Sequence, residues 1–373
     1  MTVLSHQALK ALIMGKKPMI EFGNFSEDLV QSAGIDCPLG RRAYRMRASS
    51  VPRRGEIVQD LLSDSPYDWD LKDEGSFLEK GISYIIPLDI SLSLSEGFYA
   101  VFSPKSSVGR NDVFVRVLCD NWNRFDVVSR GYSGPLYVEV TPLSYPVRIS
   151  PGLSLTQMRI RDEEERLSNT ELERLHAEHG IVRDQDGIPL PHRDLEVRQD
   201  GVFFHIDLAT SVVGFEAIAH PEAELNLAKV DTYNPRDFWR PLWGTERKTC
   251  VLSPERFYLL KTRERVIIPP DTCAWMQPYD VAAGEFRSHY AGFFDNGFGG
   301  EFGTTGVLEV RVRDVPFRLY DGQPVCHMVF ERTDEVPKKL YGKSLGSNYT
   351  EGGPSLAKHF RDRYLAWEEN YWK

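Results

Sequence analysis

The chain has 373 residues, with 45 basic and 54 acidic side chains and a formal net charge of −9. A negative surface disfavours non-specific binding to nucleic acid, because the phosphate backbone repels it. The sequence has neither a signal-peptide core nor the roughly 20 apolar residues of a membrane span, and its five scattered cysteines form no C-x-x-C pair. We therefore expect a cytoplasmic protein without nucleic-acid or membrane partners.

Short runs of β-branched and aromatic residues, separated by turn residues, predict a mainly β chain. Strands are expected at 84–88, 98–102, 113–118 and 136–140, and again at 256–260, 265–268, 306–312 and 325–330. Helices are few. One is expected at 6–14, and another begins at Ser168, where Ser168-Asn-Thr-Glu171 has the form of a capping box, and ends near Gly180. Regular short strands favour a sandwich or a distorted barrel.

Two segments of the chain look alike at a nearly constant offset, which indicates an internal duplication. Three pairs of residues carry this offset: Asp36 and Asp207 lie 171 residues apart, Lys105 and Gln277 172 apart, and Glu139 and Glu309 170 apart. We therefore expect a first domain at 1–165, a helical and polar connector at 166–200, and a second domain at 201–373.

A cluster of hydroxyl and cationic side chains follows the strand expected at 98–102. It runs from Lys105 through Ser106, Ser107 and Gly109 to Arg110. Adjacent hydroxyls, a turn at the glycine and flanking cations are suited to surround phosphate oxygens. A polar turn with a helix cap explains the same residues, and local chemistry alone favours that simpler interpretation.

One glutamate lies among strand hydrophobes in each half, Glu139 after Leu136-Tyr-Val and Glu309 after Val307-Leu. Such a glutamate either faces water by alternation or is buried, with a raised pKa unless a cation partners it. A raised pKa suits a base that collects and returns protons. Alternation favours the solvent-facing interpretation for each residue, whereas the recurrence in both halves favours the base.

A glycine-rich hairpin is expected after Ala291, with Asp295 at its turn. Such a hairpin can present backbone groups to a flat base and a carboxylate to a sugar hydroxyl, although an ordinary Asp-Asn-Gly turn is the alternative. His176-Ala-Glu178 has the H-x-E form of zinc deaminases, but the P-C-x-x-C segment that they require is absent. We therefore expect no catalytic metal.

Together these features resemble the dCTP deaminase and dUTPase superfamily, and its deaminase branch in particular. The opening 4–12 and the segment 29–36 are similar to the N-terminus of that family, and 105–110 resembles its Arg-Ser-Ser-x-x-Arg motif with lysine in the first place. Residues 291–300 resemble its hairpin, and Tyr341 and Tyr349 resemble the tail that closes over the nucleotide. The resemblance implies two tandem dUTPase-like distorted barrels.

The resemblance also implies a reaction, in which water adds to C4 of the cytosine of dCTP, ammonia leaves and dUTP results. A glutamate, Glu139 or Glu309, deprotonates the water and returns the proton to the departing amine, while Ser106 and Arg110 hold the water and the charge. No cofactor is expected beyond Mg²⁺ on the substrate triphosphate. A homo-oligomer and inhibition by dTTP are further expectations. The implied substrate-binding residues are Lys105, Ser107, Gly109, Ala291, Asp295, Val307, Tyr341 and Tyr349.

The two halves depart from the family pattern in complementary ways. The first half keeps Ser106 and Arg110 but has Ser129 where the hairpin aspartate belongs, whereas the second keeps Asp295 but has Gln277-Pro-Tyr-Asp-Val-Ala in place of the phosphate motif. Because active sites in the family form between neighbouring domains, we favour a composite site that uses Glu309. The alternative is a ring of three first copies in which Glu139 is catalytic.

Two other functions are compatible with the sequence. The first is a dUTPase or a bifunctional deaminase and dUTPase, which releases pyrophosphate and dUMP. The second is a nucleotide-binding regulator without catalysis, which Lys105, the altered second phosphate motif and Asn348 in the tail favour.

Overall fold

The computed structural model describes residues 3–163, 166–278, 286–288, 292–342, 345–349 and 352–373. It divides into two compact units, the first formed by 1–164, 224–229 and 333–339, and the second by 165–223, 230–332 and 340–373. Two short segments of the second half of the sequence thus belong to the first unit. The domain boundaries expected from the sequence stay a prediction. No helix in the described residues is long and apolar enough to cross a bilayer.

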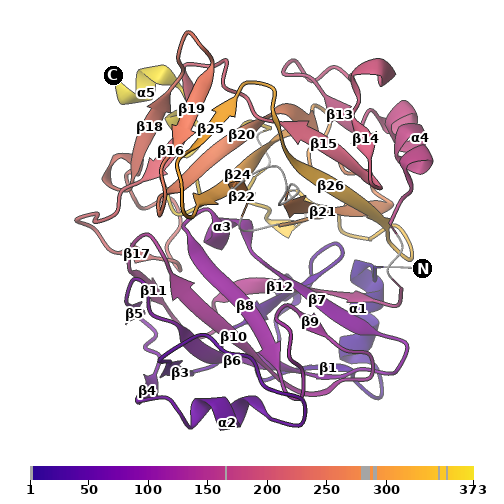
Figure 1. Ribbon diagram of the computed structural model, residues 1–373. Coiled ribbons are helices and arrows are strands. Elements are labelled where there is room, and N and C mark those ends of the chain that lie inside the picture. Colours follow the sequence, from indigo (N-terminus) through magenta and orange to yellow (C-terminus); the bar gives the residue numbers. More distant parts are fainter. Residues whose placement is uncertain (1–2, 164–165, 279–285, 289–291, 343–344, 350–351) are drawn as a thin grey trace. The chain divides into compact units, whose positions relative to one another are not determined.

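The first unit is built from three sheets (Figure 1). The largest has the order β4-β3-β6-β10-β8, with β1 also paired to β6. Its strands are β1 (Ile20–Phe22), β3 (Arg42–Arg45), β4 (Tyr67–Asp70), β6 (Tyr84–Ser93), β8 (Val113–Cys119) and β10 (Ser133–Pro142). The second sheet, β2-β12-β7-β9, contains β2 (Ile35–Pro38), β7 (Tyr99–Pro104), β9 (Val127–Val128) and β12 (Ser154–Arg161). The third, β17-β11-β5, contains β5 (Ser76–Leu78), β11 (Val147–Ile149) and β17 (Leu225–Asn226). Its helices are α1 (His6–Met14), η1 (Glu27–Leu29), α2 (Val58–Leu62) and α3 (Ser106–Gly109).

The second unit also has three sheets. The largest has the order β18-β16-β20-β24-β22, with β13 paired to β20, and contains β13 (Val182–Arg183), β16 (Val212–Ala217), β18 (Trp239–Trp243), β20 (Phe257–Val266), β22 (Phe286–Ser288) and β24 (Thr304–Val312). The sheet β14-β15-β26-β21-β23 contains β14 (Val197–Arg198), β15 (Gly201–His205), β21 (Thr272–Pro278), β23 (Phe293–Phe294) and β26 (Pro324–Arg332). The third pairs β19 (Thr249–Leu252) with β25 (Phe317–Tyr320). Its helices include α4 (Asn169–His179), η2 (His192–Asp194), η3 (Pro235–Asp237), η6 (Leu365–Trp367) and α5 (Glu369–Trp372).

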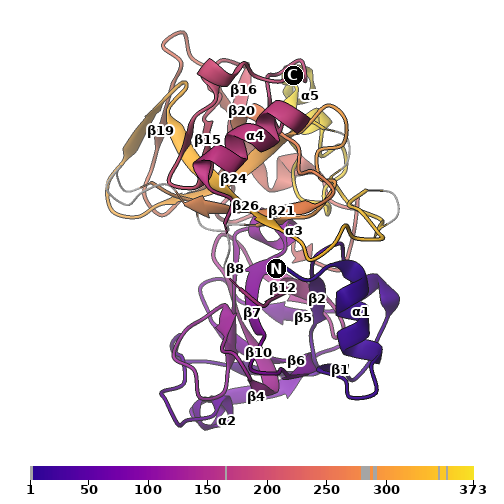
Figure 2. The ribbon, with the colours of Figure 1, turned by 90° about the vertical axis from the view of Figure 1, so that its right-hand side faces the viewer.

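The two units repeat one strand order. β4-β3-β6-β10-β8 corresponds to β18-β16-β20-β24-β22, and β2-β12-β7-β9 corresponds to β15-β26-β21-β23. A helix precedes the strands in each unit, α1 in the first and α4 in the second (Figure 2). The expected mainly β fold with two tandem copies is therefore confirmed.

The predicted helices are confirmed, and one pair of predicted strands is corrected. Helix α4 begins after Ser168, whose hydroxyl accepts a hydrogen bond from the Glu171 amide, and ends at Gly180 in the left-handed conformation. The strands expected separately at 256–260 and 265–268 form one strand, β20, because a bulge between Lys261 and Arg265 interrupts its register with β24 without ending it.

The C-terminal segment packs against one face of the large sheet of the second unit. The Trp367 ring meets the buried Phe215 ring edge-on at 4.7 Å between centroids, and Trp372 lies 5.7 Å from the same ring. Phe360 approaches Trp239 on the neighbouring strand at 6.2 Å. Buried aromatic pairs of this geometry stabilise through both their area and their ring contacts.

We expect Trp367→Ala to destabilise the second unit by about 3 kcal/mol, because it leaves a cavity against Phe215. Leu365→Ala is the matched control in the same short helix, since Leu365 is 49% exposed whereas Trp367 is 8% exposed. Urea unfolding followed by circular dichroism measures both changes. Equal midpoints for the two variants would contradict the assigned packing.

Candidate active site

The hydroxyl and cation cluster of the first half forms a single helical turn, α3. Lys105 occupies the N-cap position with extended backbone angles and makes no side-chain capping bond, so the interpretation as a helix cap is not what the structure shows. Gly109 lies within the turn rather than at a separate bend, and it is buried with Ser107. Arg110, the residue after the turn, is also buried. The cluster is therefore a fixed element rather than a loose polar loop.

A buried hydrogen-bond network supports this turn, and sequence reasoning missed it. The Asn111 side-chain amide donates to the Ser107 carbonyl over 2.7 Å, and the Tyr145 hydroxyl donates to Asn111 Oδ1 over 3.1 Å. Asp112 follows with a φ of 55° and accepts a hydrogen bond from Ser144 over 2.6 Å. Because these groups are buried, they fix the position of the turn and of Arg110 directly after it.

Lys105 is engaged within its own unit. Its ammonium forms an ion pair with Asp36 on β2, whereas the sequence assigned this lysine to the triphosphate. In the second unit Asp207 also has a lysine partner, Lys261 on β20, with Nζ 3.2 Å from Oδ2. The two aspartates thus each pair with a lysine, but Lys105 follows β7 whereas Lys261 lies on β20. The register does not make the aspartates equivalent, because the Asp207 amide donates to the Lys261 carbonyl as the Gly40 amide, not that of Asp36, donates to Pro87.

Glu139 is buried at 1% exposure, which excludes the solvent-facing interpretation. Its Oε1 accepts a hydrogen bond from the Ser49 hydroxyl over 2.8 Å, and in the strand register it lies between Ile85 and Arg116. Burial raises the pKa of Glu139 above its usual value, although Ser49, Arg116 and the main chain of Ser50 act in the opposite direction. The carboxyl is therefore placed to hold a proton more readily than an exposed glutamate.

Arg116 and Asp126 extend this cluster. Arg116 Nε donates to Asp126 over 3.1 Å, and its guanidinium lies 4.1 Å from the centre of the Phe125 ring. Burial raises the pKa of Asp126 to about 6, against the Val117 amide and Arg116. Sequence reasoning did not single out Ser49, Arg116 or Asp126, and the strand register that joins Arg116 to Glu139 was the missing information.

Glu309 occupies the equivalent position of the second unit. It lies opposite Leu259 on β20, which lies opposite Phe215 on β16, just as Glu139 lies opposite Ile85 and Ile85 opposite Tyr44. Glu309 is 4% exposed, so the solvent-facing interpretation is wrong here as well. The neighbouring Val307 is half-buried on the same strand.

The glycine-rich hairpin is held by the C-terminal tail of its own unit. The Phe298 ring packs edge-on against Phe294 and against Tyr341, at 5.1 Å in both cases. The Tyr341 amide donates to the Asn296 carbonyl over 2.9 Å, and the Tyr349 amide donates to the Tyr341 hydroxyl over 3.3 Å.

Tight backbone packing fixes the turn of this hairpin. Gly299 has a φ of 90°, and a Cβ there would lie 2.2 Å from the Val266 carbonyl oxygen. Asp295 is half-buried at the turn, and Ala291 lies outside the described residues. No group of three or more His, Cys, Asp or Glu residues in the described parts of the chain is placed to hold a metal ion.

We expect Glu139→Gln to become progressively more stable than the wild type as the pH rises from 4 to 8. A carboxyl whose folded pKa is raised contributes stability below its unfolded pKa, and that contribution is lost as the pH rises through the folded pKa. Unfolding free energies of wild type and variant at a series of pH values test this. Glu21→Gln, an exposed position on the same sheet, is the control, and a pH-independent difference for Glu139→Gln would contradict the assignment.

Comparisons with known proteins agree with this architecture. The family model for the 2'-deoxycytidine 5'-triphosphate deaminase (DCD) N-terminal domain matches residues 1–164, and the model for the DCD C-terminal domain matches 168–360. The crystal structure of 2'-deoxycytidine 5'-triphosphate deaminase from Agrobacterium tumefaciens superposes with a TM-score of 0.84 and 38% identity, over 92% of this chain and 99% of that one.

Curated relatives are similar over part of the chain. A protein of Aquifex aeolicus named "dCTP deaminase, dUMP-forming" is 34% identical over 99 residues, which are 26% of this chain and 52% of that protein. Namesakes from Methanoculleus marisnigri and Methanosphaera stadtmanae are 30% and 29% identical, over 38% and 39% of this chain and 74% and 72% of their own length. The chain thus spans about half of the Aquifex aeolicus relative. It belongs to the dCTP deaminase family.

Proposed function

We propose that this protein hydrolyses dCTP to dUTP and ammonia, with Glu309 as the general base. The observation that carries the proposal is a buried strand glutamate in the same unit as the aspartate hairpin and the tail tyrosines. Glu139 lies in the unit whose hairpin has Ser129 in place of the aspartate, and the Ser49 hydroxyl and Arg116 lie beside it.

In the proposed reaction one carboxylate first accepts a proton and then donates it. The carboxylate takes a proton from a water as the water oxygen bonds to C4 of the cytosine. The proton then passes to the exocyclic nitrogen as the C4–N bond breaks, so that ammonia leaves. The proton of the new C4 hydroxyl moves to N3 as the carbonyl of uracil forms. A buried glutamate suits both transfers, because burial in general raises the pKa of a carboxyl toward neutral pH.

The remaining roles follow the residues of the two motifs. Ser106 and Arg110, supplied by a neighbouring chain of a homo-oligomer, hold the attacking water and the charge of the glutamate. Ser107 and the Gly109 backbone contact the triphosphate with its Mg²⁺. Lys105 reaches the triphosphate only by leaving or sharing Asp36, so substrate phosphate and that carboxylate compete for one ammonium.

The second unit provides the groups for the nucleoside. Asp295 accepts a hydrogen bond from the sugar hydroxyl, and the backbone at Ala291 and Val307 faces the base. Tyr341 and Tyr349 close over the nucleotide. The contact of the Tyr341 ring with Phe298 supports this arrangement, because it ties the tail to the hairpin.

We expect Glu309→Gln to lower kcat for dCTP by about 10²- to 10⁴-fold, the usual contribution of a general base. Glu139→Gln is the matched control, with the same change in the equivalent strand, and is expected to keep its activity. Ammonia release measures both. Activity that survives in Glu309→Gln but not in Glu139→Gln would transfer the role to Glu139, and tight dCTP binding without ammonia in the wild type would indicate a regulator.

A second candidate is a dUMP-forming enzyme, which the printed names of the three curated relatives favour. Such an enzyme also cleaves the α–β phosphate bond with a water that an aspartate positions. The hairpin of the first half has Ser129 in place of that aspartate, and the hairpin of the second half has Asp295. In our proposal Asp295 binds the sugar hydroxyl, so neither hairpin has an aspartate left to position a second water.

We therefore expect dCTP turnover to release ammonia without pyrophosphate. Parallel assays of both products in one reaction provide the measurement, with dUTP alone as a second substrate. Pyrophosphate in an amount equal to ammonia, or released from dUTP, would establish the dUMP-forming reaction instead.

A further inference from the structure

The pattern Ser-Ser-Val-x-Arg occurs twice in the first unit. One occurrence is the helical turn from Ser106 to Arg110, and the other runs from Ser49 to Arg53, after strand β3. At the candidate active site the second occurrence contributes the Ser49 hydroxyl and the main chain of Ser50 to the surroundings of Glu139. Two hydroxyls and an arginine at this spacing suit an anionic ligand, which makes the surroundings of Ser49 informative.

The second occurrence is attached to the buried glutamate of its own unit. Ser49 donates its hydroxyl hydrogen bond to Glu139, and the main chain of Ser50 also interacts with that carboxylate. Met46, just before, packs with Val58 and Leu62 of α2 in a small apolar cluster of the first unit. The segment 46–50 is therefore anchored on both sides.

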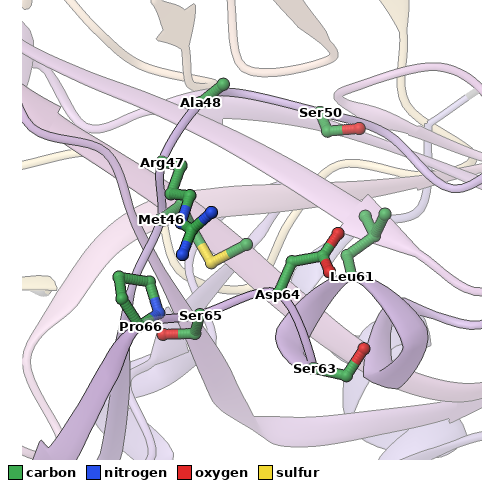
Figure 3. Close-up of a pocket in the computed structure, with 9 residues that line it drawn as sticks. All are labelled: Met46, Arg47, Ala48, Ser50, Leu61, Ser63, Asp64, Ser65 and Pro66. Carbon is green, nitrogen blue, oxygen red and sulfur yellow. The ribbon is translucent and has the colours of Figure 1, made fainter.

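A pocket of about 460 Å³ lies beside this anchored segment, between it and the end of α2 (Figure 3). This volume is within the range of sites that bind small molecules. Five of its nine lining residues are polar or charged, one of them a cation, and Ser50 is the lining residue whose main chain also interacts with Glu139. The lining residues are Met46, Arg47, Ala48, Ser50, Leu61, Ser63, Asp64, Ser65 and Pro66.

Arg47 lines this pocket and, like the exposed Arg54 outside it, differs from the other arginines of segment 41–54. The arginines at 41, 42, 45 and 53 form ion pairs with Asp73, with Asp68 and Asp70, with Glu79 and with Glu56, respectively. Arg47 makes no such ion pair within the described residues, and Figure 3 shows its guanidinium in the pocket with the carboxylate of Asp64 further along the wall. The pocket thus offers a cation, a serine hydroxyl and a carboxylate, which Figure 3 shows at separate parts of its wall.

We propose that this pocket binds a nucleoside phosphate without turning it over, as a second nucleotide site of the chain. A phosphate group binds Arg47 and the Ser50 hydroxyl, a sugar hydroxyl donates to Asp64, and the base lies on Met46, Leu61 and Pro66. The choice of ligand class rests on the proposed function. The site itself rests on the pocket and its charges.

Binding stoichiometry of α,β-imido-dUTP tests the proposal, because this nucleotide is neither deaminated nor cleaved between its α and β phosphates. Isothermal titration calorimetry on the full chain is expected to give two equivalents per chain. Arg47→Ala and Ala48→Trp, which respectively remove the cation and fill the pocket, are expected to give one. Arg54→Ala is the matched control, since Arg54 is exposed on the same segment outside the pocket, and it is expected to keep two.

Each outcome decides for or against the proposal. One equivalent in the wild type, or two in Arg47→Ala and Ala48→Trp, overturns it. Arg47→Ala is also expected to deaminate dCTP at the wild-type rate. Absence of deamination with two equivalents bound refutes the proposed function alone, whereas normal deamination with one equivalent refutes the second site alone.

Discussion

A carboxylate that lies among hydrophobic side chains of neighbouring strands needs hydrogen-bond or ion-pair partners, because an isolated buried charge is strongly unfavourable. Glu139 has them in the Ser49 hydroxyl and in Arg116 on the adjacent strand, and burial still raises its pKa. Alternation along β10 and β24 puts each glutamate on the opposite face from its two strand neighbours, so each large sheet must bury both of its faces. The burial of each glutamate therefore depends on the segment that covers the sheet face on which the glutamate lies.

The two units cover that face with unrelated segments. In the first, Met46, Val58 and Leu62 pack near Ile85, the cross-strand neighbour of Glu139. In the second, the C-terminal Trp367 and Trp372 pack on Phe215. Phe215 lies in the same row of cross-strand neighbours as Glu309, with Leu259 between them. A duplicated sheet can keep its register while its cover changes, because strand pairing and face packing use different groups. Such divergence gives two glutamates at equivalent strand positions different surroundings.

The helices at 6–14 and 169–179 and the expected strands could be predicted from the sequence, because capping residues and hydrophobic periodicity are local signals. The duplication and the family could be predicted from the spacing and resemblance of motifs along the chain. The partners of Glu139 could not be predicted, since Ser49 and Arg116 lie 90 and 23 residues away and meet it only through the sheet. The sequence also favoured solvent exposure for both glutamates. Alternation along a strand predicts that one sheet face is exposed to solvent unless the segment that covers this face is known. The assignment of 224–229 to the first unit required long-range pairing of β17 with β11.

The aspartate and lysine pairs show that each unit supplies a cation to a buried aspartate from a different part of its chain. A buried carboxylate that loses its cation is destabilised by about 3–5 kcal/mol. In the first unit Lys105 serves Asp36, so the motif lysine also has a structural task. In the second unit Lys261 pairs with Asp207, and Gln277, which lies opposite His327 as Ser103 lies opposite Gln157 in the first unit, bonds to His327 over 2.9 Å. Because the cation of Asp207 comes from β20, this ion pair does not depend on the segment after β21, whereas in the first unit the segment after β7 supplies the cation for Asp36.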